Sequence, residues 1–372
     1  MNAERLHAIA FALQADISKS AVLSNLQQLI SALSNQVSQP NQPEYQLQTS
    51  RSLVTLVDSL DSAAVNEFSP TWQQALQELG AWKTMGSNLA RQVKEIFAHN
   101  QITPSVAQQE LQTLLIELQA VSTAFDQLLV CFSVLKIGKE DLAPGECELG
   151  VLVPRSFVDN RLDRFADELR ELDRIFGVFA ELSTGSRPSF EINTISSTDL
   201  SVFLEVGAVV GACVATAVER IIAMYKTLLE VRKLQGELVK QGVDKKDLAG
   251  LETHANGIMD SGIDKLVKDL LSEFKGKVDT GRKHELSVEL KYSLKKIANR
   301  IDRGFNIEVR MAEPIQSVDA DEGAAPSVDA LMQSHAKIRS ASEALQFLKL
   351  EGDPILSLAE DKTEKSKAPR ET

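Results

Sequence analysis

Thirteen consecutive uncharged residues, Val206 to Val218, constrain the fold of this chain more than any other segment. They read VGAVVGACVATAV, with a glutamate directly before them and another directly after. An apolar helical pattern surrounds them and predicts one long apolar helix over residues 200–241, which Gly242 ends. A bilayer-spanning helix needs about 20 apolar residues, so a run of this length favours a helix buried in protein.

Three interpretations of this segment remain open from the sequence. In the first, residues 200–218 are the core helix of a helical bundle. In the second, Gly207, Gly211 and Ala215, spaced by four, form a smooth helix-packing face that joins copies of the chain. In the third, the segment inserts into a membrane, with acidic residues before it and basic residues after it.

Apolar residues at steps of three and four recur through most of the chain and predict a mainly α protein. The fold class expected is a set of long antiparallel helices, bundle-like or coiled-coil-like, with a small two- or three-stranded β element. The clearest helix is residues 160–182, where six apolar residues follow 3-4-3-4-3 steps: Leu162, Phe165, Leu169, Leu172, Phe176 and Phe179. Alternating apolar residues predict short strands near 147–153, 190–195 and 305–311.

Changes in composition along the chain predict five regions. An N-terminal helical region rich in Gln and Ser covers residues 1–137, and a central helical region with the short strands covers 138–312. An acidic linker is expected over 313–326, a C-terminal helix over 327–350, and a disordered tail over 351–372.

The sequence contains no recognisable signature for catalysis, for a metal or for a cofactor. No two of the five histidines lie three or four positions apart, and the HExxH and CxxC patterns are absent. The net charge of −12 disfavours non-specific nucleic-acid binding, which depends on attraction to phosphate. Three cysteines cannot form a disulfide scaffold, and with no signal-peptide pattern at the N-terminus they indicate a cytoplasmic protein, with peripheral membrane association as the exception.

One helix in the otherwise acidic chain presents a basic face that is a candidate for docking. It spans residues 282–303, and an acidic surface of the same chain or of another chain is its expected partner. The candidate residues are Lys291, Lys295, Lys296, Arg300 and Arg303.

These patterns favour a non-enzymatic helical scaffold or interaction protein that self-associates, as a homo-oligomer, or binds a protein partner. The alternative is a membrane-active helical protein that inserts the apolar segment 200–218. An enzyme whose active site is assembled only by the fold stays open, because sequence spacing does not reveal such a site.

Overall fold

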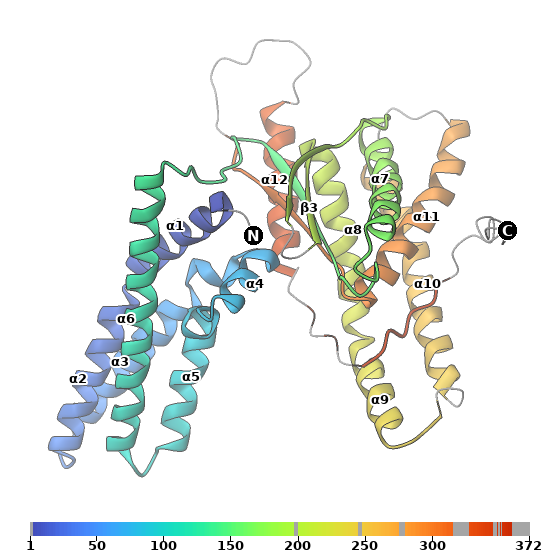
Figure 1. Ribbon diagram of the computed structural model, residues 1–372. Coiled ribbons are helices and arrows are strands. Elements are labelled where there is room, and N and C mark those ends of the chain that lie inside the picture. The colour runs from blue at the N-terminus through green and yellow to red at the C-terminus, as the bar shows by residue number, and fades with distance from the viewer. Residues whose placement is uncertain are drawn as a thin grey trace. The chain divides into compact units, whose positions relative to one another are not determined.

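The computed structural model describes residues 3–196, 200–244, 248–274, 280–314, 327–344, 348, 350 and 352–358. The chain divides into two compact units, the first ending at Asp141 and the second beginning at Leu142. Within the described residues, twelve α-helices and one four-stranded antiparallel sheet are present, which confirms the mainly α class (Figure 1).

The first unit is entirely helical. Its longest helix, α6, packs its apolar face against α1, α2 and α5, and α3 packs against α2 and α5. Ser69 caps α4 by accepting a hydrogen bond from the Trp72 amide, and a proline follows the cap. The helices are α1 (Ala3–Ser20), α2 (Val22–Ser38), α3 (Pro43–Asp61), α4 (Pro70–Glu78), α5 (Gly86–His99) and α6 (Pro104–Leu135), with short 3₁₀ turns at Ala64–Glu67 and Trp82–Thr84.

The second unit is built on the antiparallel sheet, whose strand order is β2-β3-β1-β4. Three of its strands lie where apolar alternation predicts them. Strand β1 is central and pairs Leu149 with both Leu204 of β3 and Val309 of β4. The strands are β1 (Cys147–Val153), β2 (Glu191–Ser196), β3 (Leu200–Val206) and β4 (Asn306–Met311).

Helix α8 (Ala208–Lys226) lies at the centre of this unit. It contacts the sheet through β1 and β4, and it packs against α7, α10, α11 and α12 (Figure 1). The segment from Val210 to Val218 is buried throughout, and this explains how the uncharged first half of α8 is accommodated. The surrounding helices are α7 (Leu162–Thr184), α9 (Leu229–Lys240), α10 (Ala249–Glu273), α11 (Thr280–Asp302) and α12 (Val328–Ala344).

The predicted long helix over 200–241 is wrong at its beginning and is interrupted near its middle. Residues 200–206 form strand β3, and the chain turns at Gly207 before α8 begins. A second break at Thr227 and Leu228 separates α8 from α9. The segment 200–218 is therefore a strand followed by a helix, not one continuous helix.

The predicted disordered tail, 351–372, is wrong for the part that the structure describes. Ile355, Leu356 and Leu358 are each at most 3% exposed and belong to the apolar core of the second unit. Residues 359–372 of the predicted tail, and 315–326 of the predicted acidic linker, lie outside the described residues.

Candidate functional site

The predicted small-residue face of Gly207, Gly211 and Ala215 does not form a free surface. Gly207 precedes α8 and is exposed, whereas Gly211 and Ala215 are buried within the unit. A Cβ built on Gly211 would overlap the Cys147 sulfur and lie 3.2 Å from Val309 Cγ1. Glycine at this position thus lets α8 approach the sheet closely, and the neighbour it packs on is the chain itself.

The predicted basic face of α11 is mostly used inside the second unit. Lys291 and Lys295 pair with Asp264 and Asp260 of α10, the second pair at 2.8 Å. Lys296 pairs with Glu171 of α7.

A bidentate ion pair completes this internal use of the basic face. Arg300 holds Glu168 of α7 at 2.6 and 2.9 Å, with both side chains buried. Of the five predicted docking residues only Arg303 is exposed, and its guanidinium lies 5.6 Å from the ring centre of Phe157. The acidic partner that the sequence suggested is therefore present within the chain.

A second charged cluster joins α7 to α11 through Glu181. Its carboxylate accepts hydrogen bonds from Arg282 at 2.7 and 3.0 Å and from Arg187 at 2.6 Å. The hydrogen bonds from Arg282, reinforced by those from Arg187 and opposed by burial, lower the pKa of Glu181 to about 2. A carboxylate whose pKa is lowered by folding stabilises the fold above its unfolded pKa of about 4.3 and loses that contribution as the pH falls toward 2.

We therefore expect E181Q to lower the free energy of unfolding by about 1–2 kcal/mol at pH 7. The difference from the wild type should shrink at pH 3, because Glu181 is then protonated in the unfolded chain, which removes most of the free energy that its ionised form contributes to folding. Urea unfolding at both pH values measures this. E285Q is the matched control, because Glu285 is 67% exposed and also contacts Arg282. If E181Q lowers the free energy of unfolding equally at both pH values, or no more than E285Q does, the stabilising role of the ionised Glu181 carboxylate is contradicted.

Metal-ligand clusters and cysteine thiols were the remaining places to look for a chemical site. No group of three or more His, Cys, Asp or Glu side chains among them has the arrangement of a metal site. Burial raises the pKa of the Cys147 thiol to about 12 and also raises the pKa of Cys213, so both stay protonated and unreactive at neutral pH. Cys131 is exposed, on α6.

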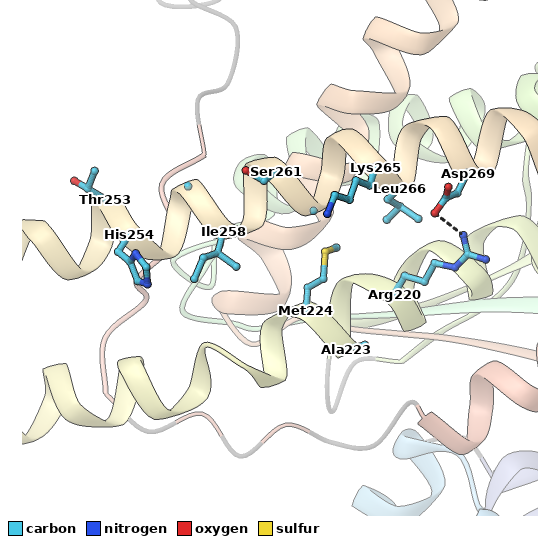
Figure 2. Close-up of a pocket in the computed structure, with 12 residues that line it drawn as sticks. Arg220, Ala223, Met224, Thr253, His254, Ile258, Ser261, Lys265, Leu266 and Asp269 are labelled. Carbon is cyan, nitrogen blue, oxygen red and sulfur yellow. Dashed lines mark ion pairs between the residues drawn. The ribbon is translucent and has the colours of Figure 1, made fainter.

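One groove in the second unit lies between α8 and α10 and encloses about 860 Å³ (Figure 2). Met224 and Ile258 point into the space between the two helices, and Leu266 lies further along the same wall. Small residues widen the groove: a Cβ on Gly257 would meet no atom within 4 Å. The groove can hold an apolar group.

Charged residues lie at one end of this groove. Arg220 forms ion pairs with Asp269 at 3.7 Å and with Glu273 at 3.0 Å (Figure 2). His254 and Lys265 are exposed on α10.

Helix α6 of the first unit carries an uncharged surface row that its sequence pattern did not single out. Its buried side faces the unit, while its solvent side holds a second row of residues at strict 4-3-4-3 steps. We call this row the outer seam of α6. All eight of its residues are exposed and uncharged: Gln109, Thr113, Ile116, Ala120, Thr123, Gln127, Val130 and Val134.

The outer seam runs for about 38 Å at 1.5 Å per residue. Ile116, Val130 and Val134 are 59%, 63% and 74% exposed, and Leu135 beside them is 67% exposed. A surface helix in water normally places charged residues at the centre of its exposed side. The heptad spacing of an uncharged seam is instead typical of a helix that packs against another helix. The heptad spacing of both rows, the buried one and the outer seam, can be seen in the sequence. The sequence does not show which of the two rows faces solvent.

Two of the described helices, α6 and α8, are long and apolar enough to cross a membrane, a weak indication on its own. They differ in burial, because 72% of the apolar window in α8 is buried and only 22% of that in α6.

No known protein family, curated protein or solved structure matches this chain.

Proposed function

We propose that this chain is a non-enzymatic helical scaffold that self-associates through the outer seam of α6. The observation that carries the proposal is the eight-residue, uncharged and exposed heptad row on that helix. Leaving Val130 and Val134 in water forgoes the gain of about 25 cal/mol per Å2 that burial of apolar surface provides. A partner helix with the same spacing supplies that burial by packing its knobs into the holes of the seam.

A second copy of α6 is the partner we favour, because the seam is complementary to itself. In an antiparallel pair with its two-fold axis near residue 125, Ala120 of one copy faces Val130 of the other. Ile116 then faces Val134 and Thr123 faces Gln127, so apolar residues meet apolar ones and polar residues meet polar ones. Gln109 and Thr113 lie outside the paired stretch, because α6 ends at Leu135. A two-fold axis closes the assembly as a dimer, the commonest form of homo-oligomer.

The double variant V130E/V134E tests the proposal. Both residues are exposed, so the fold should survive, whereas four added carboxylates at the interface should weaken association at least tenfold, which is about 1.4 kcal/mol. Sedimentation equilibrium over a concentration series measures the dissociation constant, and circular dichroism checks the helix content.

The matched control is Q27E/Q28E, which adds the same charges at two exposed positions of α2 in the first unit. This control should associate like the wild type. A wild-type chain that stays monomeric at high concentration, or a V130E/V134E variant that associates unchanged, would contradict the proposal. A monomer in which α6 crosslinks to the second unit would identify that unit as the occupant of the seam.

Membrane contact is the second candidate, and the exposed apolar end of α6 now favours it more than residues 200–218 do. Insertion of 200–218 would have to pull β3 from β1 and β2 and strip α8 from the sheet. Flotation with anionic and neutral vesicles separates the candidates. Vesicle binding that V130E/V134E abolishes would favour membrane contact, and a chain that stays unbound would favour the dimer in a cytoplasmic setting.

A further inference from the structure

The C-terminal segment Gly352–Leu358 is held in the second unit in an unusual way. It has no helix or strand of its own, and it lies along α9 and α10 (Figure 1). Its main-chain groups are bound instead by side chains from three helices, which we call the cradle: Arg232 of α9, Asn256 of α10, and Asn299 and Asp302 of α11.

The cradle contacts the main chain at four positions of the segment. Arg232 donates to the Gly352 carbonyl at 2.7 Å, and the Leu356 amide donates to Asp302 Oδ2 at 2.7 Å. The Ser357 amide donates to Asn256 Oδ1 at 2.9 Å.

Asn299 makes the fourth contact and holds both main-chain groups of Leu358. Its Oδ1 accepts from the Leu358 amide and its Nδ2 donates to the Leu358 carbonyl, both at 3.2 Å. The Asn299 side chain thus makes the two main-chain hydrogen bonds that a neighbouring β-strand would otherwise make. Main-chain bonds of this kind hold an extended peptide whatever its side chains are.

Selectivity in the cradle comes from three aliphatic side chains of the segment. At most 3% of the surface of each is exposed for Ile355, Leu356 and Leu358. The residues between and before them, Asp353, Pro354 and Ser357, are exposed. The site thus recognises two adjacent aliphatic residues and a third one position beyond them.

The charged part of the cradle is organised without the segment. Arg232 also donates to the Asp302 carbonyl at 2.6 Å, to Asp302 Oδ1 at 2.9 Å and to the Tyr225 hydroxyl at 2.8 Å. Tyr225 in turn donates to Asp302. These contacts lie within α8, α9 and α11, so departure of the segment leaves the guanidinium and the carboxylate in place.

We propose that the cradle is a binding site for extended apolar peptides of the pattern Ile-Leu-x-Leu, and that residues 352–358 are its ligand in cis. A peptide of the same pattern supplied in trans binds when the cis segment is displaced. This site lies in the second unit, so it is independent of the outer seam of α6.

The test uses the full chain with L356D/L358D, which disfavours burial of the cis segment, and a fluorescein-labelled peptide of residues 352–358. The variant should bind this peptide at least tenfold more tightly than the wild type, in which the tethered segment competes at a millimolar effective concentration. Adding N299A to the variant removes two hydrogen bonds and should weaken peptide binding about tenfold.

Two controls accompany this experiment. A peptide carrying the same two aspartates should not bind. L234D/V288D adds the same charges at two exposed positions of the second unit and should not open the site. A folded L356D/L358D variant that ignores the peptide would overturn the proposal.

Hydrogen exchange on the wild-type chain decides the matter if L356D/L358D does not fold. The amides of Leu356, Ser357 and Leu358 should exchange by local opening, at least tenfold faster than the amide of Ile297 in the middle of α11. Exchange of all four at the rate of global unfolding would make the segment a fixed part of the core and would overturn the proposal.

Discussion

Replacing Arg232 by Met is expected to lower the free energy of unfolding by about 3–5 kcal/mol, because it leaves the buried Asp302 carboxylate without a countercharge. The Asp302 side chain is fully buried and that of Arg232 is 5% exposed, with 2.9 Å between them. Without the guanidinium, the Asp302 carboxylate keeps the Tyr225 hydroxyl and the Leu356 amide as donors but loses its countercharge. Methionine fills much of the volume, so the loss reports the missing charge more than a cavity.

The pH dependence of this loss identifies its cause. Burial, opposed by Tyr225, Leu356 and Arg232, already raises the pKa of Asp302, and removal of Arg232 should raise it further. A carboxyl group with a raised folded pKa destabilises the fold as the pH rises through that value and ceases to do so once protonated. The difference between R232M and the wild type should therefore be smaller at pH 4 than at pH 8, as urea unfolding would show.

R220M is the matched control for this substitution. Arg220 is 37% exposed, and the side chains of its partners Asp269 and Glu273 are 65% and 28% exposed. Exposed ion pairs contribute about 0–1 kcal/mol, so R220M should lose no more than that. The double variant R232M/D302L removes both charges and should recover part of the loss. Equal losses for R232M and R220M would contradict a structural role for the buried pair.

The sequence predicted those elements in which one periodicity runs without interruption. The 3-4 row from Leu162 to Phe179 became α7, and the alternation in Phe305, Ile307 and Val309 became β4. In both cases polar or charged residues separate the apolar ones in the sequence, so the pattern alone identifies the element.

Prediction failed where the apolar residues of a strand follow one another without alternation. Strand β3 lies between β2 and β1 and buries Ser201, Val202 and Phe203 in succession, so its alternation is lost. Its apolar run continues directly into α8, and only Gly207 marks the change from strand to helix. Continuous apolar runs do not distinguish a central strand from a buried helix.

The two proposed binding surfaces were missed for different physical reasons. The burial of Ile355, Leu356 and Leu358 depends on side chains 54–120 positions earlier in the chain, which no local pattern encodes. The heptad spacing of the outer seam can be read from the sequence, but the buried row of α6 has the same spacing. Only the fold determines which of the rows the chain itself covers.

The close packing of α8 on the sheet yields the second large effect, at Gly211. Alanine normally stabilises a helix by about 1 kcal/mol relative to glycine. At Gly211 the added methyl group would overlap the Cys147 sulfur and press on Val309. We expect G211A to lower the free energy of unfolding by about 1–3 kcal/mol, since overpacking forces the helix away from the strand.

A double-mutant cycle with C147A tests whether this contact causes the loss. Removing the sulfur makes room for the methyl group, so G211A should cost at least about 1 kcal/mol less in the C147A background than in the wild type. G257A on α10 is the matched control, because its methyl group would meet no atom within 4 Å and should be neutral or stabilising. A G211A variant that behaves like G257A would mean that α8 does not press on β1.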